Sequence, residues 1–363
     1  MFLLCFLCHF SKAFAQQQEG SPPAAGQLQA RSSQSPESED RRLVLDIAVT
    51  DRSGKAVTGL EEKDFTVLDD GHPQKVSSFQ AVRGGVAVAG NAQRTETLVK
   101  IILLVDEANT EFNRVAYERE QIRQFLMQNG GKLTHPMSLF FFSDMGTEVQ
   151  GAATRDGNAL LALYDKHETA LRTIVRSQGA YGALDRLHLS LNTLKSLMSK
   201  EARQPGRKVV IWISPGWPIL SGPDIELRLK DEQSLFSSVV GFSTVLRQIR
   251  MTIYSIDPVG VDADGLNANF YEQFLKPVTA AKKTEIGNLA LQVLATQSGG
   301  LALRSGNDIT EQINHCIADT DAYYTLAVET EPSDQPNVYH AVTVKVAAPG
   351  LTVRTRNGYY AQP

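Results

Sequence analysis

The chain has 363 residues, of which 42% are hydrophobic, so it is long enough to form two or three ordinary domains with apolar cores. Its formal net charge of −4 gives no long-range attraction to nucleic acid or to acidic membranes. No basic stretch with interleaved aromatic residues is present in the sequence, which also argues against nucleic acid as a partner.

The first residues indicate export. Residues 1–15 form an apolar segment that closes on Ala13-Phe14-Ala15, the small-residue pattern that signal peptidase accepts. We expect a cleaved signal peptide and therefore a secreted or periplasmic protein. Because no Lys or Arg precedes the apolar run, an uncleaved short anchor is the alternative. No later segment reaches the roughly 18 apolar residues that span a bilayer.

Residues 16–42 are rich in Gln, Ser, Pro, Gly and Glu and have hardly any aliphatic side chains. Such a segment cannot bury enough apolar surface to offset the entropy of ordering, so we predict a disordered linker. With the signal peptide removed, Cys316 is the one remaining cysteine, which leaves no internal disulfide. Its position on an apolar helical face indicates a core residue.

Two segments that are far apart in the sequence predict β-structure. Residues 43–84 and 321–363 carry apolar side chains at every second position, as expected of strands with one buried face. In the first segment, Asp69-Asp70-Gly71 predicts a hairpin turn. Each segment alone is too small to close a hydrophobic core. We therefore expect one small β-sandwich made of both segments, with residues 98–320 inserted between them.

The inserted region alternates continuous apolar runs with helical patterns. We predict strands at 101–105, 137–142, 147–151, 209–213, 251–256 and 299–303, and helices at 113–128, 157–176, 181–200, 232–250, 284–296 and 308–318. Strands that alternate with helices predict an α/β fold with a doubly wound, mostly parallel sheet covered on both faces.

Several predicted strands end in polar residues. Asp106, Asp144, Ser214 and Asp257 each follow an apolar strand. Because the carboxyl ends of parallel strands meet at one edge of a sheet, we expect these residues to gather there and to contact a partner. Trp217 follows Ser214 closely, and it either serves as an exposed aromatic anchor or packs inward.

A structural interpretation of the loop after Asp106 competes with the functional one. A carboxylate at this position favours the positive end of the following helix. Asn109 or Thr110 would then cap that helix, at about 1 kcal/mol.

Several stretches of the sequence are similar to those of a known protein family. They are, in chain order, VTDRSGKAVTGLEEKDFTVLDDG, LLVDEANT, GRKVVIWISPGWP, ATQSGGLALRSGNDI, and YYTLAVE with GLTVRTRNGYYA. With them, residues 98–318 resemble a von Willebrand factor type A domain, and the whole mature chain resembles the secreted bacterial proteins of the acidobacterial VWFA-related domain family. The resemblance implies a Rossmann-like fold and says little about activity.

Type A domains commonly hold a divalent cation through an Asp-x-Ser-x-Ser loop, a Thr and a second Asp. By this resemblance, Asp106 matches the first Asp and Thr110 the last hydroxyl, whereas Ala108 replaces the middle Ser. Tyr181 stands where the Thr is expected, and Ser214 stands near the expected second Asp.

The implied site is therefore degenerate, and we expect it to bind Mg²⁺ or another divalent cation weakly. The residues that could restore ligands at the same edge are Asn109, Ser214, Asp144 and Asp257.

The catalytic motifs G-x-S-x-G, H-E-x-x-H, the P-loop and G-x-G-x-x-G after a strand are missing from the sequence. We therefore expect an exported protein-binding or adhesion module that is not an enzyme. The first alternative is a hydrolase of uncommon type that uses Asp106, Asp144 and Asp257 as an acidic cluster. The second is a purely structural component of the cell envelope.

Overall fold

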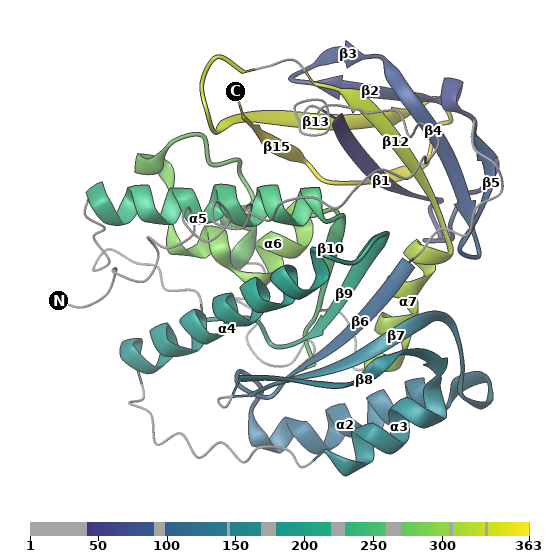
Figure 1. Cartoon of the computed structure of the whole chain (residues 1–363), viewed down its shortest axis with the longest axis vertical. Helices are drawn as coiled ribbons and strands as arrows, with labels where there is room; N and C mark the ends of the chain where they lie inside the picture. Colours follow the sequence, from purple (N-terminus) through teal and green to yellow (C-terminus); the bar gives the residue numbers. More distant parts are fainter. Residues whose placement is uncertain are drawn as a thin grey trace, which may run out of the picture.

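A computed structural model describes residues 42–90, 99–143, 146–167, 179–218, 229–258, 270–304, 308–330 and 333–362. The predicted signal peptide, Asp144 and the predicted linker apart from its last residue lie outside these ranges. The described chain forms an α/β unit and a β-sandwich (Figure 1). Among its helices, none has the length and apolar content needed to cross a membrane.

The α/β unit is built on a six-stranded sheet with the order β11-β10-β9-β6-β7-β8. Neighbouring strands from β11 to β7 pair in parallel, and β8 pairs with β7 in the antiparallel direction. The strands are β6 (Val99–Asp106), β7 (Lys132–Ser143), β8 (Gly146–Asp156), β9 (Arg207–Ile213), β10 (Met251–Ile256) and β11 (Ala302–Leu303). The predicted mixed α/β class with a mostly parallel sheet is confirmed.

Alternate residues of β6 enter two separate cores, as the two-residue period of a strand requires. Ile102 and Leu104 pack with residues of α4 (Ala180–Glu201), α5 (Leu229–Gln248) and α6 (Leu291–Gln297). On the other face, Ile101 and Leu103 pack with α2 (Phe112–Met127), α3 (Gly157–Lys166) and α7 (Ile309–Asp321). Cys316 belongs to this second core, and its burial raises the pKa of the thiol well above its ordinary range.

Two helical predictions differ from the structure, one in its length and one in its continuity. The predicted helix at 157–176 ends at Lys166, because His167 has extended backbone angles, and residues 168–178 are not described. The predicted helix at 284–296 is interrupted at Ala290, which is also extended. The short 3-10 helices are η2 (Glu62–Asp64), η3 (Gln128–Gly131), η5 (Phe270–Phe274), η6 (Ala281–Lys283) and η7 (Ile286–Leu289).

The sandwich consists of two sheets, with the orders β14-β1-β12-β4-β5 and β15-β13-β2-β3. Its strands are β1 (Arg42–Thr50), β2 (Phe65–Asp69), β3 (His72–Gln74), β4 (Val76–Arg83), β5 (Val86–Gly90), β12 (Ala322–Glu329), β13 (Val338–Val346), β14 (Thr352–Arg354) and β15 (Gly358–Ala361). In the first sheet β12 lies between β1 and β4, so residues from both ends of the chain share hydrogen bonds. The rings of Phe65, Phe79 and Tyr324 meet in the core between the sheets.

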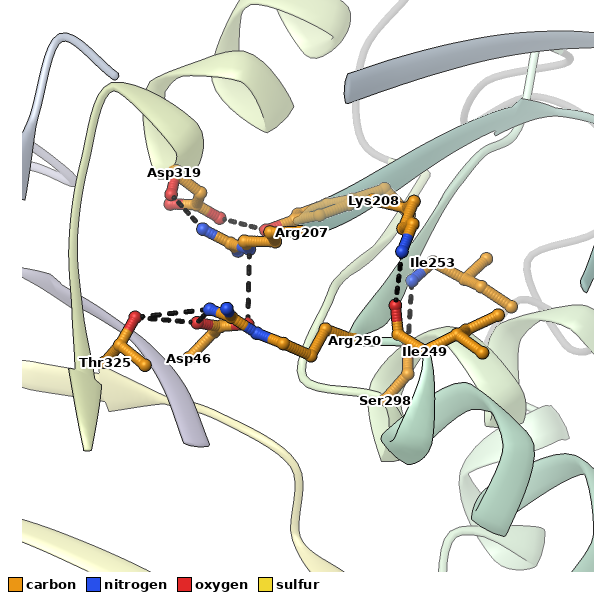
Figure 2. Close-up of polar contacts among 10 residues, drawn as sticks. Asp46, Arg207, Lys208, Ile249, Arg250, Ile253, Ser298, Asp319 and Thr325 are labelled. Carbon is orange, nitrogen blue, oxygen red and sulfur yellow. Dashed lines mark hydrogen bonds and ion pairs between the residues drawn. The ribbon is translucent and has the colours of Figure 1, made fainter. Parts of the chain in front are cut away.

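A polar seam joins the two units at the amino ends of the parallel strands (Figure 2). Asp46, on β1, accepts hydrogen bonds from the guanidinium of Arg250 and from the Thr325 hydroxyl, at 2.9 Å for the latter. The Arg207 Nε lies 3.9 Å from the other oxygen of Asp46. Burial acts to raise the pKa of Asp46, but the charges of Arg250 and Arg207 outweigh it and hold the pKa below its ordinary value.

A second ion pair at the seam is bidentate. The guanidinium of Arg354 donates to the two oxygens of Asp319 at 2.7 and 2.6 Å, and the Tyr254 hydroxyl donates to the same carboxylate at 2.8 Å. Asp319 belongs to α7 and Arg354 to β14, so this pair also links the α/β unit to the sandwich.

We predict that Asp46→Asn lowers the free energy of unfolding by about 3 kcal/mol, because it leaves the buried Arg207 and the partly exposed Arg250 without their counter-charge. The matched control is Asp165→Asn, which removes an exposed partner of Arg123 and should cost only about 0.2–1 kcal/mol. Urea denaturation at pH 7 measures both.

The pH dependence of the Asp46 effect has a defined sign. Its pKa is lower in the folded chain than the ordinary value of 3.8, so its stabilisation is complete above that value and is lost as the pH falls through the lowered pKa. The two curves, for the parent and for Asp46→Asn, should therefore converge in acid. Equal costs for the two variants at pH 7 would contradict the assigned role of Asp46.

Candidate functional site at the carboxyl edge of the sheet

The carboxyl ends of β6, β9 and β10 lie at one edge of the sheet, on the side away from the sandwich (Figure 1). Asp106 ends β6, and Ser214 and Asp257 directly follow β9 and β10. The Ser214 N–H donates to the Ile256 carbonyl at 2.9 Å, which joins the loops after β9 and β10. The structure thus brings together three of the four strand-end residues that the sequence analysis selected, and Asp144 is outside the described residues.

Asp106 is completely buried and accepts hydrogen bonds at both carboxylate oxygens. The Asn109 backbone N–H donates to Oδ1 at 2.9 Å, and the Asn109 Nδ2 lies 3.1 and 2.9 Å from Oδ1 and Oδ2. The Ser214 hydroxyl and the Trp212 Nε1–H donate to Oδ2 at 2.8 and 3.2 Å. Burial raises the pKa of Asp106, and the hydrogen bonds from Asn109, Ser214 and Trp212 oppose that shift without cancelling it.

These donors do not fit a divalent cation. A cation needs open lone pairs on hard oxygen ligands, whereas the Asp106 oxygens face N–H and O–H groups. The Asn109 Nδ2 also donates to the Ser190 hydroxyl oxygen at 3.0 Å, so an amide group bridges the polar atoms that a cation would join. Ala108 has no side-chain oxygen, and Tyr181 is 77% exposed.

The capping interpretation was wrong. The residue that caps α2 is Glu111, which makes no side-chain capping bond. Asn109 turns instead toward Asp106, and the Thr110 hydroxyl is buried without a hydrogen-bond partner among the described residues.

The other selected residues are also buried. Trp217 is 3% exposed, and its ring meets that of Trp212 edge to face at 5.1 Å, so the inward alternative is the one observed. Asp257 is 6% exposed and pairs with the Arg304 Nε at 3.1 Å. Asp106, Trp217 and Asp257 therefore offer almost no surface that a partner could touch directly, and their contribution to binding would be to hold the loops.

Sequence reasoning missed a second acidic residue beside this site. Glu118 of α2 is 2% exposed; its carboxylate oxygens make no hydrogen bond of ordinary geometry to a described residue, although the nearby Thr110 hydroxyl favours its charged form. Burial raises the pKa of Glu118 well above its ordinary value, and the charges of Asp106 and Glu107 raise it further. A signal was present in the sequence, because Glu118 precedes the buried residues Ile122 and Phe125 at helical spacing.

His167 lies next to these acids. Its Nε2 is 3.0 Å from Glu107 and its Nδ1 is 3.6 Å from Glu148. Its ring stacks on Phe141 with a centroid distance of 3.5 Å. Asp106, Glu107, Glu118 and His167 thus lie together at this edge as a mostly buried group of three acids and one imidazole.

A different group in the sandwich could hold a metal ion. The ligand atoms of Asp69, Asp70 and His340 all lie within 4.8 Å of one another, and the His340 Nδ1 is 3.1 and 3.2 Å from the two carboxylates. One imidazole with two carboxylates suits a transition metal better than Mg²⁺. The same residues are satisfied without an ion, because the Tyr359 hydroxyl and the Ala341 N–H each donate to one of the carboxylates at 2.8 Å.

A scan against protein-family models finds no match, and a search of curated proteins finds none. Among solved structures the chain is similar to BatB from Bacteroides thetaiotaomicron, at 11% identity and a TM-score of 0.29, over 61% of this chain and 97% of that one. It is similar to the VWA domain of SpRpn10 at 16% identity and a TM-score of 0.23, over 44% and 75% of the two chains.

The chain is also similar to the pilus adhesin SpaC from Lactobacillus rhamnosus GG, at 10% identity and a TM-score of 0.36. That match covers 84% of this chain and 49% of SpaC, so the chain spans about half the length of the adhesin. A VWA domain is thus among the structures that this chain resembles, and likenesses of this size carry no information about function.

We predict that Glu118→Gln removes a pH dependence of stability. Because the pKa of Glu118 is raised in the folded chain, ionisation favours the unfolded chain as the pH rises above the ordinary value of 4.5. The parent should therefore lose stability with rising pH, by at most about 1.4 kcal/mol per pH unit from this group. Glu118→Gln should be flatter and more stable than the parent at pH 8.

The control is Glu120→Gln on the same helix, whose carboxylate is 56% exposed. Urea denaturation between pH 4 and pH 9 compares the three proteins. If Glu118→Gln kept the slope of the parent, Glu118 would be ionised at neutral pH.

Proposed function

We propose that the chain is an exported protein-binding module of the adhesion type, related to the acidobacterial VWFA-related proteins and built on a doubly wound type A fold. Its binding surface is the carboxyl edge of the α/β sheet, and it works without a bound metal ion. The sequence of residues 1–15 supports export to the periplasm or the cell exterior.

The Asp106 hydrogen-bond network is the observation that carries this proposal. It links the loop after β6 through Asn109, the end of β9 through Ser214, and α4 through Ser190. The Gly216 N–H extends the network by donating to the Ser214 hydroxyl at 3.1 Å. Because protein groups fix these segments before a partner arrives, less conformational entropy is lost on binding.

Exposed apolar side chains lie in the segments that lead to or from this end of the sheet. Helices α4 and α5 end just before β9 and β10 begin, so their first residues point toward the carboxyl edge. Those first turns carry Tyr181, which is 77% exposed, and Leu229, which is 67% exposed. Phe270, which is 38% exposed, begins η5 after β10. Exposed aromatic and aliphatic residues at one edge are typical of protein interfaces.

The hydrolase alternative has less support. A carboxylate that acts as a base or a nucleophile needs an oxygen free to meet substrate. The oxygens of Asp106 are filled by donors, and Asp257 is paired with Arg304. A purely structural envelope protein would tolerate changes at Tyr181 and Leu229, which the next experiment tests.

We predict that a photo-crosslinking amino acid at position 181 or 229 attaches the protein to one and the same partner in the cells that make it. Val88, on the edge strand β5 of the sandwich, is the control position, because it is 54% exposed but lies in the other unit. Adducts are identified by mass spectrometry. An adduct pattern shared by positions 88, 181 and 229, or no adduct at 181 and 229, would contradict the proposed surface.

We also predict that Asn109→Asp creates a metal dependence that the parent lacks. The new carboxylate would face Asp106 in a buried site and should cost about 3–5 kcal/mol without metal, as an uncompensated buried charge does. Millimolar Mg²⁺, Mn²⁺ or Ca²⁺ should restore part of this stability, because two carboxylates and two Ser hydroxyls are hard oxygen ligands.

The control for this experiment is Asn314→Asp on the exposed face of α7. Thermal unfolding and calorimetric titration measure the response to each cation. Heat of Mg²⁺ binding to the parent that disappears in Asp106→Ala would overturn the metal-independent interpretation.

A further inference from the structure

Three side chains that can bind a metal ion lie together in the β-sandwich, in the unit that does not carry the candidate site. Asp69 ends β2, Asp70 begins the turn that leads to β3, and His340 lies on the neighbouring strand β13 (Figure 1). Their ligand atoms all lie within 4.8 Å of one another. Asp69 and His340 are 271 residues apart in the sequence, so the group joins the two segments from which the sandwich is built.

The two oxygens of each carboxylate have different partners. The Tyr359 hydroxyl donates to Asp69 Oδ2, and the Ala341 N–H donates to Asp70 Oδ1, both at 2.8 Å. The other two oxygens, Asp69 Oδ1 and Asp70 Oδ2, lie 3.1 and 3.2 Å from His340 Nδ1. Donors outside the group thus orient one oxygen of each carboxylate toward the same imidazole nitrogen. Metal-binding carboxylates are commonly oriented by outer donors in this way.

A single proton serves this arrangement poorly. The Nδ1 of an imidazole carries at most one proton, so it cannot give a full hydrogen bond to both carboxylates that face it. A metal ion can bond to the nitrogen and to both oxygens at once. Zinc bonded at about 2.0–2.1 Å in tetrahedral geometry holds its ligand atoms about 3.3–3.4 Å apart. The two N···O distances are close to this separation, so the ion requires only small shifts of the side chains.

Packing and backbone contacts hold the three ligands in place. The His340 ring stacks on the Tyr359 ring, with a centroid distance of 5.1 Å and an interplanar angle of 21°. Asp70 has a left-handed backbone with a φ of +47°, and its N–H donates to the Ala341 carbonyl at 2.9 Å. Burial raises the pKa of Tyr359, and the hydrogen bond to Asp69 raises it further, so the hydroxyl keeps its proton and remains a donor.

We propose that Asp69 Oδ1, Asp70 Oδ2 and His340 Nδ1 bind one zinc ion, with water in the fourth position. Zinc takes nitrogen and oxygen ligands in tetrahedral geometry, whereas Mg²⁺ and Ca²⁺ prefer oxygen ligands alone. Tyr359 is a positioning residue, because its hydroxyl acts through Asp69. The ion ties the turn after β2 to β13 and so stabilises the sandwich. This inference is independent of the proposed binding surface at the carboxyl edge of the sheet.

Calorimetric titration of the full, metal-stripped chain without a histidine tag tests the proposal. We expect one zinc ion to bind per chain and the midpoint of thermal unfolding to rise with zinc and then saturate, as ligand binding to the folded chain requires. Mg²⁺ at the same concentrations should leave the midpoint unchanged. No binding of zinc, or equal effects of zinc and Mg²⁺, would overturn the proposal.

Variants assign the zinc to this group of residues. His340→Gln and Asp70→Asn should each weaken zinc binding by about a hundredfold, because one of three protein ligands is lost. Asn tolerates the left-handed backbone of position 70 and keeps an oxygen for the Ala341 N–H. The control is His315→Gln on the exposed side of α7, which should bind zinc as the parent does. Equal zinc affinity in all four proteins would refute the site.

The role of Tyr359 has a separate readout. Tyr359→Phe should weaken zinc binding by about tenfold and keep one ion per chain, as expected when an outer hydrogen bond to a ligand is lost. A hydroxyl that only supports the fold would change the unfolding midpoint of the metal-free chain and leave the zinc affinity as in the parent.

Two measurements keep the test decisive if His340→Gln fails to fold. Asp70 is 48% exposed, so Asp70→Asn should fold and report the loss of a ligand by itself. In crystals grown with zinc, the anomalous signal should place an ion between Asp69, Asp70 and His340. Zinc found only at other histidines would be an adventitious ion only and would refute the proposal.

Discussion

A charged side chain can be buried only if other groups replace the water that it loses, and this constraint acts at both ends of the parallel sheet. At the carboxyl edge, Asp106 is surrounded by neutral N–H and O–H donors. At the amino edge, Asp46 is held by the charges of Arg250 and Arg207. The hydrogen bonds to Asp106 fix the loops at the carboxyl edge to one another. The ion pairs of Asp46 fix the sheet to the sandwich.

The two ends are connected by rigid elements. Strand β9 begins with Arg207 at the seam and ends with Trp212 and Ile213 beside Asp106. All seven of its residues are buried, so it has packing on both faces along its whole length. Because the sandwich covers the amino edge, the carboxyl edge is the end of the sheet on the side away from the sandwich (Figure 1).

Much of this arrangement could be read from the sequence. Continuous apolar runs give the parallel strands, and the residues that follow them must then meet at one edge. Asp106, Ser214 and Asp257 do meet there. The direction of individual side chains could not be read in the same way. Asn109 and Trp217 are compatible with a cap and a surface anchor until tertiary contacts turn both inward.

Charged residues were the hardest to interpret from sequence. Arg207 and Arg250 flank strands and look like solvated ends, but the sandwich, which comes from both ends of the chain, covers them. Glu118 looks like one more charge on a helix that also carries exposed acids and bases. Glu118 is buried because its position in the helical period faces the sheet. The residue types around it in the sequence do not show this.

The neutral donors around Asp106 also bear on the raised pKa of Glu118. A divalent cation beside Asp106 would offset the negative charge of that carboxylate, whereas the Asn109, Trp212 and Ser214 donors are neutral and leave it in place. A second buried carboxylate nearby then meets repulsion as well as desolvation when it ionises. Both effects raise the pKa of Glu118, with desolvation as the larger cause. The raised pKa of Glu118 and the neutral donors around Asp106 are therefore linked, because both depend on the uncompensated negative charge at the end of β6.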